Sequence, residues 1–315
     1  MKKLFINMLL YAVLIALCLE VVIRLLHLTK DYPVRYVDEF GVEKWVPNQR
    51  GFAVTGIRRQ HFSEYHINNS GYNSYREFHP TPDQVEIALV GDSFIEGFHQ
   101  QYTNSIGKKI EQRLKDVEVY EYGYAGYDFA DQLHMINTYK ETFDLVDYVV
   151  LGLKFENDLT RSSYTVVQDR MKLETPLYKT LRQSKLLVYL QNVGAFDAAK
   201  SLLSKITSVN NNNKAISKRS SETELQDQYI INFKRLVHTY GYDKQRFTIL
   251  LDAAQTPPIF LKYLEDNGFR YLDFSEPLQA SKTPTNLIYD MHWNNHGRTL
   301  IAELVADFVA ENIEK

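Results

Sequence analysis

The chain has 315 residues, which is enough for one large domain with an insertion or for two domains. Its net charge of −3 lacks the positive field that nucleic-acid-binding proteins carry, so nucleic acid is excluded as a partner. The single cysteine, Cys18, excludes an intrachain disulfide and any cysteine-based metal cluster.

A long apolar stretch opens the chain. It runs from Leu4 to Leu28 and carries two charged residues, Glu20 and Arg24. About 25 apolar residues in a helix can cross the ~30 Å hydrocarbon core of a bilayer. Glu20 and Arg24 are four residues apart and share one helical face, where they either pair near the outer interface or reach the headgroups separately.

An uncleaved anchor and a cleaved signal peptide both fit such a stretch. No small-x-small cleavage site follows the apolar run, and Leu17 stands where a lipoprotein signal needs a small residue before Cys18. We therefore expect residues 1–30 to form a transmembrane anchor. Lys2 and Lys3 favour a cytoplasmic N-terminus, which places the rest of a single-pass protein in the periplasm.

Residues 31–82 are mixed in character, aromatic and rich in turn formers. We expect them to form an extended connector with short strands that packs on the main domain. From residue 83 to residue 315 the pattern changes to apolar strands alternating with amphipathic helices. Strands are expected at 86–90, 117–122, 145–153, 247–251 and 269–274, and helices at 104–114, 130–139, 259–267 and 296–313. Gly268 is suited to the position that follows the end of a helix.

Residues 159–239 contain no good strand and are expected to be a helical insertion. Its helices are expected around 178–190 and 222–239, separated by a polar loop whose tip holds the asparagines 210–213. The alternation outside the insertion predicts an α/β fold, in which a parallel sheet is covered by helices on both faces as a three-layer sandwich. In such a sheet, ligands bind at the carboxyl ends of the strands.

The first predicted strand ends in Gly91, Asp92 and Ser93. A serine on a strand-to-helix turn projects toward solvent beside free backbone N–H groups, although the same tripeptide is also a common turn. A serine hydroxyl is a weak nucleophile and needs a base. This position therefore makes Ser93 a candidate nucleophile.

A candidate base precedes the last helix. Asp290 and His292 are two residues apart, so the carboxylate can fix the tautomer of the imidazole and stabilise its protonated form. The alternative is a metal site formed by Asp290, His292 and His296, because the two histidines can share a helical face. No further converging ligand is evident, so we expect no metal. The remaining histidines that we considered are expected to be surface or structural residues: His61, His66, His99 and His134.

Two more residues follow predicted strands. Gly126, after the second strand, can present its N–H to an oxyanion with no side chain in the way, or it can form a plain turn. Asn157, after the third strand, can donate from its side-chain amide, or it can cap a helix.

Taken in order, these four segments resemble the sequence blocks of the SGNH (GDSL-like) hydrolase superfamily. The residues that carry the resemblance are Gly91, Asp92 and Ser93, then Gly126, then Asn157 and Asp158, then Asp290 and His292. The ending Asp-x-His-Trp-Asn-x-x-Gly is similar to that of a membrane-anchored bacterial branch related to polysaccharide O-acetyltransferases and esterases. In that branch the N-terminal span often carries Glu and Arg, as Glu20 and Arg24 do here.

The resemblance implies a flavodoxin-like α/β/α sandwich over residues 83–315 and a role for each residue. Ser93 is the implied nucleophile and also gives its backbone N–H to the oxyanion hole. Gly126 and Asn157 are the other implied oxyanion donors. His292 is the implied general base and acid, and Asp290 orients it.

The chain departs from the family pattern at two positions. The family commonly has Asp three residues before the histidine, where Tyr289 stands here. The Asp-x-His variant occurs in related polysaccharide O-acetyltransferases, so this departure concerns the role of Asp290. Phe155 replaces a glycine often found two residues before the block asparagine, which concerns the geometry of that loop.

We therefore expect an extracytoplasmic serine ester hydrolase that uses a Ser-His-Asp triad and no cofactor. Its expected substrate is an ester or an acylated glycan, such as a cell-envelope polysaccharide. One alternative is an O-acyltransferase that moves acetyl groups to a polysaccharide hydroxyl. A second alternative is a non-catalytic, membrane-tethered protein that binds or assembles glycans. Fold alone does not decide among them.

Overall fold

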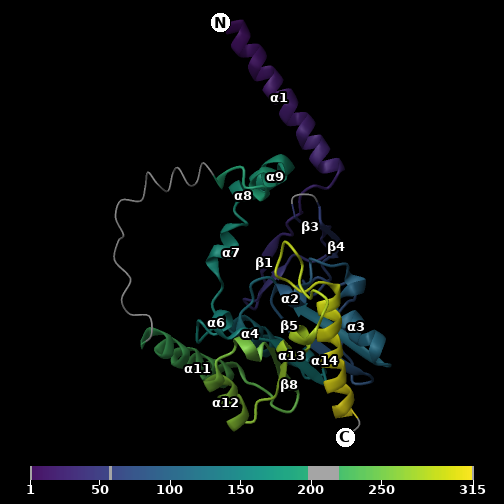
Figure 1. The fold of residues 1–315 in the computed structure, drawn as a ribbon, viewed down its shortest axis with the longest axis vertical. Coiled ribbons are helices and arrows are strands. Elements are labelled where there is room, and N and C mark those ends of the chain that lie inside the picture. Colours follow the sequence, from purple (N-terminus) through teal and green to yellow (C-terminus); the bar gives the residue numbers. More distant parts are fainter. Residues whose placement is uncertain (1, 57–58, 198–219, 314–315) are drawn as a thin grey trace.

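The computed structural model describes residues 2–56, 59–197 and 220–313. Helix α1 (Lys2–Leu25) projects away from the rest of the chain (Figure 1). Within the described residues it is the one helix long and apolar enough to cross a membrane, and its side chains are almost all exposed. These properties fit the expected anchor and also fit a signal sequence.

Two antiparallel hairpins follow α1. Strand β1 (Arg35–Val37) pairs with β2 (Glu43–Trp45), and β3 (Arg50–Thr55) pairs with β4 (His61–His66). Side chains from this region, including Trp45 and Ile67, are buried in the same apolar cluster as residues of the central sheet. These two hairpins therefore pack against the central sheet.

The central sheet has five parallel strands in the order β6-β5-β7-β8-β9. They are β5 (Val85–Gly91), β6 (Val117–Gly123), β7 (Tyr148–Gly152), β8 (Phe247–Leu251) and β9 (Tyr271–Asp273). This order reverses at β5, as in flavodoxin-like sheets, and confirms the predicted α/β class. Strand β7 begins three residues later than predicted, because Leu145 lies in the turn that follows α5 (Lys140–Phe143) and is exposed.

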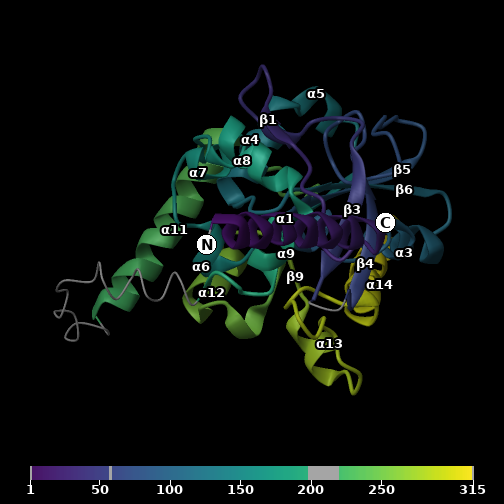
Figure 2. The ribbon, with the colours of Figure 1, turned by 90° about the horizontal axis from the view of Figure 1, so that it is seen from above.

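Helices cover both faces of the sheet (Figures 1 and 2). Successive residues of β5 alternate between the two faces: Ile87 and Leu89 are buried in one apolar cluster, and Ala88 and Val90 in the other. The first face is covered by α3 (Ile106–Arg113) and α14 (Asn295–Ile313), and the second by α4 (Phe129–Thr138), α11 (Ser220–Tyr240) and α12 (Pro258–Asp266). Gly268 follows α12 with a φ of +67°, as its position predicted.

The remaining helices lie in connections. They are α2 (Ser93–Glu96), α6 (Phe155–Asp158), α7 (Gln168–Lys172), α8 (Pro176–Gln183), α9 (Lys185–Asn192), α13 (Ser275–Ala280) and the short 3₁₀ turns η1 (Tyr102–Asn104) and η2 (Ala253–Gln255). The helical segment expected at 178–190 is two helices, because Ser184 leaves the helical conformation and caps α9 through its side chain. The asparagines 210–213 lie outside the described residues.

Candidate active site

Ser93 lies at the turn between β5 and α2. Strand β5 ends at Gly91, and the Oδ1 atom of Asp92 accepts a hydrogen bond from the Phe94 N–H at 2.9 Å, which caps α2. Ser93 is the first residue of that helix, so its own N–H is one of those that a helix leaves unpaired. The second oxygen of Asp92 pairs with the Lys154 ammonium at 3.0 Å.

The position of α2 depends on a glycine in the neighbouring strand. A Cβ atom on Gly123, the last residue of β6, would lie 2.0 Å from the Glu96 backbone nitrogen and 2.5 Å from the Ile95 carbonyl carbon. Side chains do not tolerate such distances, so only glycine lets α2 lie directly on the end of β6. This close packing fixes the helix that carries Ser93.

Ser93, Asp290 and His292 come together, although they are far apart in the sequence. The Nε2 atom of His292 lies 2.7 Å from the Ser93 Oγ, and its Nδ1 contacts the Oδ1 of Asp290. The same carboxylate oxygen also accepts the His292 backbone N–H at 3.0 Å. Tyr289, which occupies the position where the family commonly has Asp, is exposed, and Asp290 makes the contact with the imidazole.

His99, which the sequence led us to expect as a surface or structural residue, lies beside Asp290 and His292. Its Nε2 lies 3.0 Å from the Oδ2 of Asp290, and its ring stacks on the His292 ring with 4.0 Å between centroids. Burial, together with the nearby His292, lowers the pKa of His99 to about 4. At neutral pH His99 is therefore uncharged, with its Nε2 in contact with the Asp290 carboxylate. His99 lies six residues after Ser93, but this spacing does not predict its contact with Asp290. That contact depends on how the loop after α2 and the loop before α14 meet in space.

The carboxyl group of Asp290 is ionised. Burial by itself raises the pKa of Asp290, but the hydrogen bonds from the His292 side chain and backbone, with the neighbouring His99, hold it below its ordinary value. Its Oδ1 contacts the His292 side chain and backbone, and its Oδ2 lies beside the His99 Nε2. This arrangement fixes the His292 tautomer that presents an unprotonated Nε2 to Ser93.

Aromatic packing holds the His292 ring from another side. The Phe94 ring lies 4.5 Å from it between centroids, and the buried Trp293 packs against the edge of Phe94 at 4.7 Å. Sequence reasoning did not single out Phe94 or Lys154. The Lys154 ammonium lies 3.8 Å from the centre of the Phe94 ring, so the cation contacts both Asp92 and this aromatic group.

The two other predicted oxyanion donors, Gly126 and Asn157, follow the strands β6 and β7, which flank β5. Gly126 is exposed, with a φ of +90°, in the loop after β6. Asn157 lies in α6, after β7, and lines a cleft next to the triad. Within the described residues neither is hydrogen-bonded to Ser93, which an oxyanion donor does not require because it points at the substrate oxygen.

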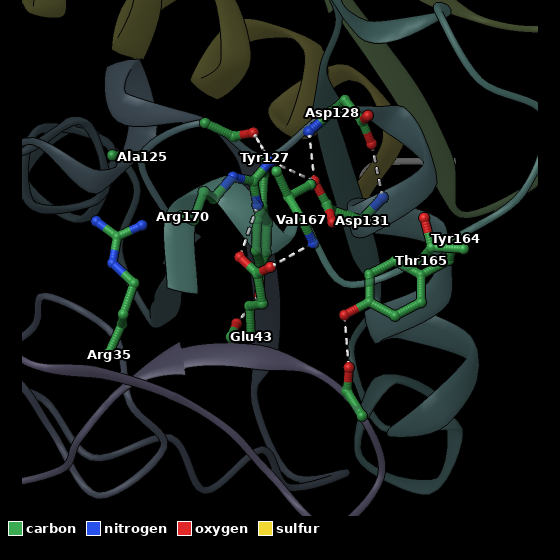
Figure 3. A network of polar contacts seen from close by, with 12 residues as sticks. Arg35, Glu43, Ala125, Tyr127, Asp128, Asp131, Tyr164, Thr165, Val167 and Arg170 are labelled. Atoms are coloured by element: carbon green, nitrogen blue, oxygen red, sulfur yellow. Dashed lines mark hydrogen bonds and ion pairs between the residues drawn. The ribbon is translucent and has the colours of Figure 1, made fainter. Parts of the chain in front are cut away.

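A buried ionic network holds the Gly126 loop (Figure 3). Arg170 of α7 pairs with Glu43 at 2.8 Å and with Asp131 at 3.1 Å, and it also donates to the Gly126 carbonyl. Glu43 belongs to the connector and accepts the Val167 N–H from the insertion at 2.8 Å. The connector and the insertion therefore jointly fix the loop that follows β6.

A cleft of about 550 Å³ opens beside the triad. Its lining combines aromatic side chains with amides and hydroxyls, among them Phe94, Phe274, Trp293, Asn157, Gln255 and Thr256. Such a mixture suits a ligand that has both apolar faces and hydroxyl groups. The cleft shares Phe94 and Trp293 with the surroundings of His292, and its lining also includes Asp92, the residue before Ser93.

The residues of the alternative metal site do not assemble as that hypothesis required. His296 lies beyond Trp293 in the sequence, and its Nε2 contacts the Ser281 Oγ at 2.9 Å. His99, Asp290 and His292 do gather, with one ligand atom of each within 4.8 Å of the others. Both nitrogens of His292 already face partners, Asp290 and Ser93, so the gathering is accounted for by hydrogen bonds.

No family model matches the chain, and no curated protein does. Among solved structures, a member of the lipolytic G-D-S-L protein family from Veillonella parvula is 14% identical, with 71% of this chain and 97% of that one covered and a TM-score of 0.38. A carbohydrate acetylesterase family member from Sinorhizobium meliloti is 11% identical, covering 71% and 97%, with a TM-score of 0.36. The psychrotrophic esterase EstA from Pseudoalteromonas is 9% identical, covering 73% and 99%, with a TM-score of 0.40.

These descriptions include the hydrolase family that the four sequence segments resemble. At these identities and TM-scores the likeness decides neither the fold nor the function of this chain. We therefore base the function on the contacts that Ser93, His292 and Asp290 make in this chain.

Proposed function

We propose that this chain is a serine ester hydrolase of the SGNH type, held by α1 at the membrane with its catalytic domain outside the cytoplasm. The observation that supports it most is the 2.7 Å contact between the His292 Nε2 and the Ser93 Oγ. A serine and a histidine at this distance, with a carboxylate on the other imidazole nitrogen, form the arrangement that activates a hydroxyl for attack on a carbonyl.

In the proposed reaction, the Ser93 Oγ attacks the ester carbonyl while the His292 Nε2 takes the hydroxyl proton. The C–O bond to the alcohol then breaks, and His292 returns that proton to the leaving alcohol. A water molecule attacks the acyl-serine with His292 again as base, which releases the acid and restores Ser93. Asp290 keeps the imidazole oriented and stabilises its charged form in each step.

The proposed oxyanion hole consists of the Ser93 N–H, the Gly126 N–H and the Asn157 amide. Ser93 is supported by its place at the first residue of α2, where N–H groups are free. Gly126 is supported by its exposed, left-handed backbone, and Asn157 by its place in the lining of the cleft. Preorganised donors of this kind typically contribute about 3 kcal/mol each to stabilisation of the transition state.

For the substrate we propose an acetylated glycan of the cell envelope. The support is the cleft of about 550 Å³, whose aromatic and amide lining suits a sugar ring and its hydroxyl groups. The same cleft favours one second function, O-acyl transfer, because it has room for an acceptor alcohol beside the acyl-serine. The acceptor hydroxyl then replaces water in the second half of the reaction.

Turnover of p-nitrophenyl acetate by the full-length protein in detergent tests the hydrolase. We expect release of nitrophenol by the wild type, and its loss in Ser93→Ala and in His292→Ala. The control is Ser281→Ala, which removes another hydroxyl near the same loop and is expected to keep its activity. A folded wild type without turnover would favour the non-catalytic, glycan-binding alternative.

A product analysis separates hydrolysis from transfer. The protein is incubated with the acetyl ester and a soluble oligosaccharide, and the sugars are examined by mass spectrometry. Free acetate without acetylated sugar identifies a hydrolase. Acetylated sugar that depends on Ser93 identifies a transferase.

A further inference from the structure

We propose that helices α8 and α9 form a platform that lies in the interface of the membrane crossed by α1, with the exposed apolar face of α8 in contact with lipid. This platform, residues 176–192, is part of the insertion for which the sequence suggested no role. The proposal rests on the anchoring of α1 and is independent of the chemistry at Ser93. Figures 1 and 2 show α9 beside the end of α1 that enters the domain.

The first support is the environment of Glu20 in α1. Its carboxylate accepts the backbone N–H groups of Lys185 and Leu186, at 2.9 and 2.7 Å, and the Ser184 hydroxyl at 3.1 Å. These donors are the free N–H groups at the start of α9 and its capping side chain. Arg24 completes the junction by pairing with Glu20 and donating to the Gln183 carbonyl.

The second support is the height of this junction along α1. Glu20 comes eighteen positions after Lys2, which is a rise of about 27 Å in an α-helix. The hydrocarbon core of a bilayer is about 30 Å thick, so charges at Lys2 and Glu20 fall at its two surfaces. The start of α9, which is bonded to Glu20, therefore lies at the level of the outer headgroups.

The third support is the composition of α8. Leu177 and Leu181 are four residues apart on one face of the helix and are 67% and 44% exposed. The adjacent Tyr178 is also exposed. An isolated apolar face of this kind is costly in water, whereas at the height fixed by Glu20 it meets the boundary of the acyl chains.

Basic residues occupy the other sides of α8 and the start of α9. Lys179 and Arg182 of α8 lie within 3.7 and 3.5 Å of Glu174, and Lys185 of α9 pairs with Asp31 at the chain's exit from the membrane. Lysine and arginine around an apolar face are typical of helices that lie on anionic lipid surfaces. The same side chains also join the platform to the domain, since Arg182 lies 5.0 Å from the centre of the Tyr32 ring.

The platform has a consequence for the site. Lys30, five residues after the end of α1, is half-buried and interacts electrostatically with both Asp290 and Glu96. Fixing α9 to Glu20 therefore also fixes the distance between the membrane and the triad. The favoured substrates are esters on molecules that reach the membrane surface.

Spin labels on single cysteines in full-length protein test the proposal, in nanodiscs of phosphatidylethanolamine and phosphatidylglycerol. In a Cys18→Ser background, the labels are placed through Leu177→Cys and Leu181→Cys on the apolar face of α8. Lys179→Cys, on the opposite face, is the matched control, and Leu10→Cys in α1 is the membrane reference. Collision with dissolved oxygen and with a water-soluble nickel chelate is measured for each.

We expect labels at 177 and 181 to resemble the label at 10, with high oxygen and low nickel accessibility, while 179 shows the reverse. Labels at 177 and 181 as accessible to nickel as 179, with 10 in lipid, would overturn the platform and leave the anchor intact. Protection of 177 and 181 from both reagents would also overturn it, because a protein surface then covers that face. Nickel access at position 10 would contradict the anchor itself, whatever the esterase assay shows.

Discussion

The two sides of the triad are held in different ways. Ser93 lies between a strand that is buried from its second residue on and a helix that packs backbone to backbone on Gly123. Asp290 and His292 lie in the loop between α13 and α14, where the neighbouring Ile288 and Met291 are 86% and 75% exposed. The sheet therefore sets the position of the proposed nucleophile, whereas side-chain contacts set the position of the proposed base.

A few bonds hold the loop of the base. The Asn294 side chain donates to the Pro284 carbonyl at 2.7 Å, and the Leu287 N–H donates to the His292 carbonyl at 2.9 Å. Trp293 is the buried anchor between them. We expect substitutions on the Ser93 side to reduce stability, and substitutions on the His292 side to reduce activity or change its pH dependence.

The largest effect is expected for Asp290→Asn. An amide cannot stabilise the charged imidazole and disturbs its tautomer, so kcat should fall on the order of 10⁴-fold while thermal unfolding changes little. The control is Tyr289→Phe at the adjacent exposed position, which should keep full activity. Near-normal turnover by Asp290→Asn would mean that another group orients His292.

Next in size is Gly123→Ala on the nucleophile side. The new methyl group overlaps the Glu96 backbone nitrogen, so α2 must move, and we expect a loss of about 3 kcal/mol in the free energy of unfolding together with loss of turnover. Gly152→Ala on β7 is the control, because a Cβ there has its nearest neighbour at 3.7 Å. Urea unfolding of both variants in detergent measures the difference. Equal stability of the two variants would show that the close packing of α2 is unimportant.

The two sides of the proposed triad also differ in how much of each the sequence could predict. The strands were predictable because buried parallel strands are continuous apolar runs. Ser93 was predictable because it follows such a strand, and His292 because it precedes the last helix. Gly123 was not singled out, because its role comes from the approach of α2 in space. His99 was missed for the same reason, and the break at Ser184 appeared only once Glu20 was seen to accept the N–H groups of α9.

A smaller, pH-dependent effect is expected for Glu96→Gln. Burial raises the pKa of Glu96 to about 7, while its Oε1 accepts the Trp45 indole N–H at 2.7 Å and the Ala125 N–H at 3.1 Å. Between pH 4.5 and 7 the folded state therefore holds this proton more tightly than the unfolded state, so stability falls as pH rises through that window.

Glutamine keeps both hydrogen bonds and removes the charge. The variant should match the wild type near pH 4 and exceed it by about 2 kcal/mol at pH 8. Denaturant unfolding across this range measures the difference, with the exposed Glu141→Gln as control. A constant difference at all pH values would contradict the raised pKa.

The smallest effect is expected for His99→Phe, which keeps the stacked ring and removes the nitrogen that contacts Asp290. We expect a fall of about tenfold in kcat/KM, the size of one lost polar contact to a charged group. Without His99 the pKa of Asp290 rises, so the acid limb of the pH profile should move to higher pH. A uniform fall at every pH would assign His99 a purely structural role.

The most direct test of the proposed triad is labelling with a fluorophosphonate probe, followed by mass spectrometry of the labelled peptide. We predict an adduct on Ser93 in the wild type and none in His292→Ala, with both proteins shown to be folded by circular dichroism. An adduct on another serine, or equal labelling of Ser93 without His292, would contradict an activated Ser93–His292 pair.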